Sequence, residues 1–255
     1  MLITILLFFG LAAFLVWYLQ SKDRGEREPI EMLWAAAGFG FAAMIVAIVF
    51  EKFLPGNLAD LQDSAASNAS RAGIMFGIGL IEEVCKFVPL AFFLYKKRYF
   101  NEHTDGILYF ALAGIGFGLP ENILYTLGQG TGAGVGRLIL MPFFHAALTA
   151  IPGYYLAKAK LKRKPLWHVA VALGAVVFLH GFYNFGLIAH NYFLLLISLA
   201  TTISLVVVLF MLIAKAKSED QAIGLSVVGQ NAFCRNCGWP NPKRQLYCER
   251  CGKYA

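Results

Sequence analysis

The sequence predicts an all-α polytopic membrane protein of about seven transmembrane helices, followed by a small zinc ribbon. Of its 255 residues, 58% are hydrophobic and only 15% are charged, whereas about a quarter are charged in an ordinary soluble domain. The apolar residues form runs of about 20, the length that crosses the hydrocarbon core of a bilayer. Near the C-terminus the chain has two Cys-x-x-Cys pairs, a spacing typical of metal sites.

The apolar runs predict the individual helices, at roughly residues 1–20, 30–50, 72–95, 106–127, 137–157, 166–189 and 191–214. The first run begins at Met1, with no basic segment before it and no cleavage site after it, so we interpret it as a retained helix. We assign residues 1–217 to a membrane domain, 218–231 to a polar linker and 232–255 to a cytoplasmic ribbon.

The loops predict the orientation of the chain in the plasma membrane. Lys and Arg crowd the odd-numbered loops, such as residues 96–98 and 158–164, and the segment after the last helix. By the positive-inside rule, the N-terminus faces outside and the C-terminus is cytoplasmic. The net charge of +7 comes largely from these loops, where it suits anionic lipid headgroups. We therefore expect the lipid bilayer as a partner and no nucleic acid.

Polar side chains interrupt four of the predicted helices. Glu82 and Glu83 lie four and three residues before Lys86, so Lys86 can pair with either carboxylate on one helix face. The next three helices carry, in order, Glu121 with Asn122, His145 with Thr149, and His180 with Asn184. Ionisable groups inside a membrane are costly unless they face protein or water, and they usually mark function. A structural ion pair between helices is the alternative.

The depths of these groups indicate a shared site. At about 1.5 Å per residue, Glu82 lies ~15 Å below the outer face, His180 ~14 Å, His145 ~12 Å and Glu121 ~9 Å. A carboxyl group in a low-dielectric site can act as a general base on water, and histidine can orient that water or transfer its proton. An asparagine amide can stabilise an oxyanion. The chain has neither a Gly-x-Ser-x-Gly nor a Gly-x-Gly-Asp pattern, which disfavours serine and aspartyl mechanisms.

Four short motifs carry a family resemblance. They are Glu-Glu-Val-Cys-Lys at 82–86, Phe-Gly-Leu-Pro-Glu-Asn at 117–122, His-Ala-Ala-Leu-Thr at 145–149 and His-Gly-Phe-Tyr-Asn at 180–184. In this order they resemble the motifs of the PrsW family of intramembrane proteases, which is related to the type II CAAX prenyl endopeptidases. The resemblance covers roughly residues 70–190. It implies cleavage of membrane-anchored protein substrates by Glu82, Glu83, Glu121, His145, His180 and Asn184, supported by Lys86, Asn122 and Thr149.

The resemblance leaves the mechanism open. Members of the family have been called metalloproteases, whereas the related prenyl endopeptidases look glutamate-dependent. Two His and two Glu suit zinc, but the chain lacks a His-Glu-x-x-His pattern, and we favour a glutamate-activated water without a catalytic metal. The alternatives to a protease are a proton-coupled transporter, which also needs buried Glu, His and Lys, and a non-catalytic membrane receptor.

The cysteine pairs predict the ribbon. Cys234, Cys237, Cys248 and Cys251 have the spacing Cys-x₂-Cys-x₁₀-Cys-x₂-Cys, and a glycine follows each pair. Four thiolates form a closed tetrahedral set that holds structural zinc and leaves no position for catalysis. Glycine allows the tight turn that such a site needs after each pair. The basic residues of this segment suit either an acidic partner in the cytoplasm or a solvated surface.

Overall fold

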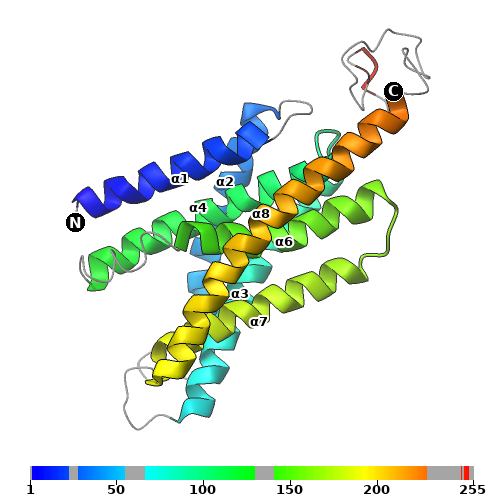
Figure 1. Ribbon diagram of the computed structural model, residues 1–255. Helices are drawn as coiled ribbons and strands as arrows, with labels where there is room; N and C mark the ends of the chain where they lie inside the picture. Colours follow the sequence, from blue (N-terminus) through cyan, green and yellow to red (C-terminus); the bar gives the residue numbers. More distant parts are fainter. Residues whose placement is uncertain are drawn as a thin grey trace.

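The computed structural model describes residues 2–22, 28–54, 67–129, 141–228, 248 and 250–252, and its regular secondary structure over these residues is entirely α-helical. The helices are α1 (Leu2–Lys22), α2 (Ile30–Glu51), α3 (Asn68–Tyr95), α4 (His103–Gln129), α6 (Met141–Leu161), α7 (Trp167–Ile188) and α8 (Tyr192–Val228). Figure 1 shows them crossing one another as long rods. The all-α fold and its seven predicted helices are confirmed.

Five of these helices, α1, α2, α4, α7 and α8, are long and apolar enough to cross a membrane. The chain is therefore a multi-pass membrane protein. The other two helices carry polar residues along their length. Helix α3 has 28 residues and is interrupted by Glu82, Glu83 and Lys86. Helix α6 has 21 residues, most of which are buried. A helix enclosed by other helices does not need an apolar face toward lipid, so α6 tolerates His145 and Thr149.

Glycines bring the helices together around the centre of the molecule. A side chain at Gly40 of α2 would collide with the backbone of Ala113 in α4, and one at Gly114 of α4 would collide with the backbone of His145 in α6. On the other side, Gly79 of α3 lies directly against Gly181 of α7. Small residues allow this close approach between membrane helices. The helices that carry the polar residues are thus packed backbone to backbone.

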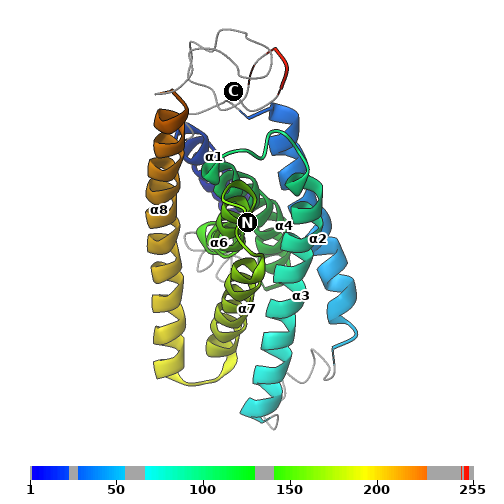
Figure 2. The ribbon, with the colours of Figure 1, turned by 90° about the vertical axis from the view of Figure 1, so that its right-hand side faces the viewer.

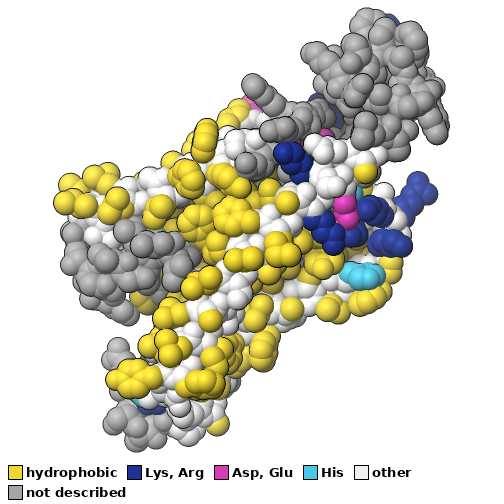
Figure 3. All heavy atoms as spheres, in the orientation of Figure 1, with side chains coloured by type: hydrophobic (Ala, Val, Ile, Leu, Met, Phe, Trp, Pro, Cys, Tyr) yellow, Lys and Arg dark blue, Asp and Glu magenta, His cyan; other side chains and the backbone are white. Residues whose placement is uncertain are grey.

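The last helix continues beyond the predicted end of the membrane domain. Residues 218–228, which the sequence analysis places in a linker, belong to α8. Figure 2 shows α8 as a long rod along one side of the molecule, opposite α2 and α3. Figure 3 shows Lys and Arg side chains gathered at the end of the molecule where α6 ends. There Glu219 of α8 pairs with Lys158 at 3.2 Å and with Lys162 at 3.5 Å.

Asp220 joins the end of α8 to the start of α4. Its carboxylate accepts hydrogen bonds from the backbone N–H groups of His103, at 2.7 Å, and Thr104, at 2.9 Å. It also accepts one from the Thr104 hydroxyl and lies 2.6 Å from His103 Nδ1. The first N–H groups of a helix have no partner within the helix, and a carboxylate there also favours the helix dipole. Asp220 therefore caps α4 from a different helix.

Candidate active site

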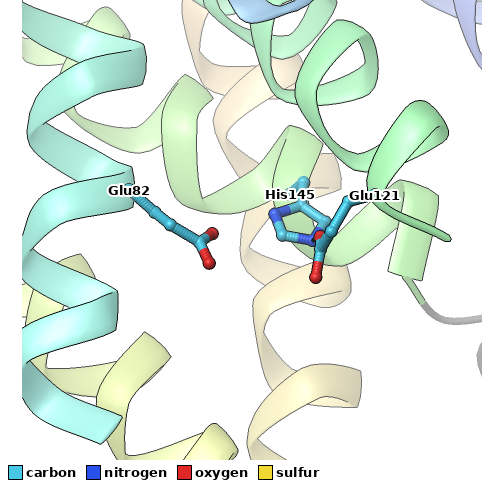
Figure 4. Close-up of side chains that lie close together, drawn as sticks. All are labelled: Glu82, Glu121 and His145. Carbon is cyan, nitrogen blue, oxygen red and sulfur yellow. Dashed lines mark ion pairs between the residues drawn. The ribbon is translucent and has the colours of Figure 1, made fainter. Parts of the chain in front are cut away.

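The polar residues of four helices form one buried cluster. Glu82, Glu83 and Lys86 come from α3, Glu121 from α4, His145 from α6 and His180 from α7. Figure 4 shows the Glu82 side chain extending from α3 toward Glu121 and His145 on the facing helices. The cluster is shielded from solvent: Lys86 and Glu83 are fully buried, and only the Glu121 side chain is exposed to a larger extent, 17%. The structure thus brings together the polar residues for which the sequence predicts similar depths in the membrane.

The two neighbouring glutamates have different surroundings. Glu83 Oε1 lies 2.5 Å from Lys86 Nζ and 2.7 Å from His180 Nδ1, so its charge is already paired. Glu82 Oε2 lies 3.7 Å from Lys86 Nζ and 3.6 Å from His180 Nε2, and it makes no hydrogen bond. Sequence spacing could not separate these glutamates. The contacts make Glu83 an anchor of the cluster and leave Glu82 available to a ligand.

Lys86 links both sides of the cluster. Its ammonium group lies 3.3 Å from His145 Nδ1 and 4.3 Å from the centre of the Phe117 ring, besides its contact with Glu83. Because an ammonium group only donates hydrogen bonds, His145 Nδ1 accepts here and Nε2 carries the proton. His145 Nε2 then faces Glu121 Oε2, 2.7 Å away, although the two atoms do not have the geometry of a hydrogen bond. This chain of contacts sets the tautomer of His145 in the structure.

His180 has the opposite arrangement. Its Nδ1 faces the carboxylate of Glu83, so this nitrogen carries the proton and Nε2 presents a lone pair toward Glu82. Phe144 holds the ring in place by an edge contact, with ring centres 5.3 Å apart, and also touches the ring of His145. A histidine whose Nδ1–H is held by a carboxylate is oriented to bind a metal or to accept a proton through Nε2.

A set of three side chains has the donors and spacing for a metal ion. One oxygen from each of Glu82 and Glu121 and one ring nitrogen of His145 lie within 4.8 Å of one another. Catalytic zinc commonly has three protein ligands of the His and Glu type, with the fourth position left for water or substrate. Glu82 Oε2, buried without a hydrogen bond, is the kind of atom that a cation would satisfy. The donor set therefore fits a divalent metal.

The remaining predicted residues lie near the cluster but contact their own helices. The Asn122 amide donates to the Gly118 carbonyl at 2.7 Å, and the Thr149 hydroxyl donates to the His145 carbonyl at 3.0 Å. Asn184 is partly buried one turn after His180. These contacts suit the supporting role expected of Asn122 and Thr149. Asn184 as an oxyanion donor stays a prediction.

Glu51 is an acidic neighbour of the cluster that the sequence analysis did not single out. It is the last residue of α2, and its charge interacts with those of Glu82 and Glu121. In the sequence it directly follows the helix predicted at residues 30–50, so it was not counted among the polar residues inside the membrane. The spacing of the buried alanines that precede it on α2 is the signal that could have revealed it.

Comparison with known proteins identifies the family. Residues 28–214 match the model of the PrsW family, described as intramembrane metalloproteases. The chain belongs to this family. It is 32% identical over 176 residues to "Protease PrsW" of Geobacillus kaustophilus, covering 69% of this chain and 75% of that protein. It is 31% identical over 178 residues to the Bacillus subtilis protein of that name, covering 69% and 78%. No solved structure gives a significant match.

Membership of the PrsW family confirms that the chain is an intramembrane protease, a hydrolase. It sets aside the transporter and the receptor as main functions. Family membership also implies membrane-anchored substrates. The Oceanobacillus iheyensis relative, 34% identical over 188 residues, matches over 72% of this chain and 82% of its own length.

Only the second cysteine pair can be placed in the structure. Cys234 and Cys237 lie outside the described residues, while Cys248 is buried and Cys251 is partly buried. Gly252, directly after this pair, has φ +65 and donates its N–H to the Cys248 carbonyl at 2.8 Å. This positive φ is the conformation for which glycine is suited. It agrees with the tight turn expected after the cysteine pair, and the ribbon itself stays a prediction.

Proposed function

We propose that Glu82, Glu121 and His145 are the centre at which this protease hydrolyses its substrates, and that they hold a divalent metal ion, most simply zinc. The observation that carries this proposal is the grouping of their three donor atoms within 4.8 Å. The description of the family as metalloproteases supports it. We therefore prefer the metal to the metal-free glutamate mechanism that the sequence alone favoured.

The charges of the cluster give a physical reason for a cation. The cluster contains three carboxylates, Glu82, Glu83 and Glu121, but only one ammonium group, Lys86. With neutral histidines this leaves a formal excess of two negative charges inside the membrane, where uncompensated charge is costly. A divalent cation balances the excess, and so do two protons. The donor set and the family favour the cation.

Each residue then has a distinct role. A bound metal would activate water and polarise the scissile carbonyl. His145 ligates through Nε2 only after its proton moves to Nδ1, and Lys86 then retains Glu83 as its hydrogen-bond partner. His180 accepts a proton from water through Nε2 and delivers it to the leaving nitrogen, while Glu83 holds Nδ1. Asn184 stabilises the oxyanion from one turn further along α7.

Metal analysis of two proteins tests the proposal. The full-length protein and its Cys234→Ser, Cys248→Ser double variant are purified and incubated with a panel of single-span membrane proteins, and new termini are identified. We expect about two zinc ions per chain in the parent and about one in the variant, because the ribbon holds one. Chelation should stop cleavage by the variant, and zinc should restore it. Cleavage by a variant that contains no metal would instead establish the metal-free glutamate mechanism.

We further propose that the chain lies in the plasma membrane with its N-terminus outside and its ribbon in the cytoplasm, where the ribbon binds an acidic partner. The gathering of Lys and Arg at the end of α6 supports this orientation. A reporter fused after Lys217 should give a cytoplasmic signal, and one inserted between residues 56 and 68 should give an external signal. The reverse pattern would overturn the orientation.

A further inference from the structure

The buried face of α2 leads directly to Glu51. Gly40, Ala43 and Ala47 lie on one face of this helix and are buried, with Gly40 packed against α4. Glu51 follows Ala47 by four residues, so it lies on the same face one turn further on. It is partly buried. A carboxylate therefore continues the stripe of small residues that packs against the helices of the active site.

The packing of α2 on α3 sets the depth of Glu51. The two helices lie side by side (Figure 2). Ile81 and Cys85 of α3 pack against a cluster that α2 forms, Ala47 included, together with Phe117 of α4. Leu54, just after α2, fills the space beside Gly77 of α3. Glu51 lies between Ala47 and Leu54, so it stands opposite residues 78–82 of α3. This is the level of Glu82, not the level at which α3 begins.

The carboxylate of Glu51 lacks ion pairs of the kind that the charged groups of the cluster make. The carboxylate interacts electrostatically with Glu82, Lys86 and Glu121, but it is outside the group of metal donors. In the part of the chain that the structure describes, it has no hydrogen bond or ion pair. Lys86 is already held by Glu83. An anion at this depth lacks the compensation that buried charges normally have.

We propose that Glu51 is a specificity-determining residue, whose carboxylate binds a cationic side chain, Lys or Arg, of the substrate close to the cleaved bond. This inference rests on the proposed function of the Glu82, Glu121 and His145 site. A substrate cation would supply the missing partner of Glu51, and pairing favours the ionised carboxylate. The three carboxylates nearest the reaction would remain engaged with the metal and Lys86.

A charge-reversal experiment tests this role. A single-span substrate from the cleavage panel is prepared as a series in which Lys, Gln or Glu replaces each residue near the cleaved bond in turn. For the parent protease we expect kcat/KM to be about 10- to 100-fold higher with Lys than with Gln at one position, as for a hydrogen bond between charged groups. Glu51→Gln should remove this preference, and Glu51→Lys should shift it to Glu.

Two controls keep the outcomes distinct. Glu31→Gln changes an exposed carboxylate in the first turn of the same helix and should leave the preference intact. Glu51→Gln should retain the metal of the cluster, since Glu51 is not a ligand. A parent protease with no preference at any position, or a Glu51→Gln variant that keeps the preference, would overturn the role of Glu51. Either result would leave the metal site untouched, which is tested by its own metal content.

Discussion

Glu82→Gln should abolish cleavage while leaving the fold stable. The change keeps the shape of the side chain but removes a carboxylate that makes no hydrogen bond through Oε2. In the proposed mechanism Glu82 is a metal ligand, so its loss weakens the centre that would activate water, and we expect the rate to fall by about 10²–10⁴-fold. Because Glu82 is not the main partner of Lys86, thermal unfolding should change little. Rates are measured on a verified membrane substrate, and unfolding is followed in the same detergent.

Glu83→Gln is the matched comparison. This glutamate accepts contacts from both Lys86 and His180, so its neutral replacement leaves a buried ammonium group without its closest counter-charge. Removing one partner of a buried pair typically costs about 3–5 kcal/mol. Both the rate and the unfolding temperature should therefore fall. If Glu82→Gln cleaves at the parental rate, Glu82 is not part of the reacting centre.

Gly118→Ala should also reduce activity strongly, through the position of His145. A methyl group at Gly118 would lie 2.5 Å from His145 Cδ2, closer than non-bonded carbon atoms come, so the ring must shift. A displacement of about 1 Å in an active site can lower the rate about 10²-fold. Alanine is also the better helix former by about 1 kcal/mol. We therefore expect a stable protein with a low kcat.

Gly128→Ala provides the control for this prediction. Gly128 lies on the same helix, and a methyl group there would meet no atom within 4 Å. Its replacement should leave both cleavage and stability close to those of the parent. Equal activity of the Gly118 and Gly128 variants would show that His145 tolerates displacement, and this would argue against its place among the metal donors.

Much of the site could be predicted from the sequence because polar and charged side chains inside a membrane are energetically costly without partners. Glu82, Glu121, His145 and His180 interrupt apolar helices, and such interruptions need partners at similar depth. The structure brings these residues together. Spacing alone could not choose between Glu82 and Glu83, since Lys86 can reach both from one helix. The choice depends on His180, which α7 brings to Glu83 alone within hydrogen-bond distance.

Other features could not be predicted because they arise from contacts between distant segments. Gly114 and Gly118 are four residues apart, a spacing common where membrane helices pack closely, but the sequence could not show that both lie against His145. Glu51 lies just past the helix predicted at residues 30–50, and only the packing of α2 on α3 brings it to the level of Glu82. Residues 218–228 looked like a linker because they are polar, but Glu219 and Asp220 find partners on α4 and α6 that favour a continued helix.

Because Asp220 caps α4, it limits where the chain can be cut and joined to another module. The polar residues after the last apolar run add nothing to the hydrophobic spans of a protease embedded in lipid. However, the first turn of α4 obtains its hydrogen-bond acceptor from residue 220, and the same helix carries Glu121 at its other half. The enzyme therefore includes the end of α8 that carries Asp220. An exchange of the cysteine tail for another module has to keep Asp220 on the enzyme's side of the junction.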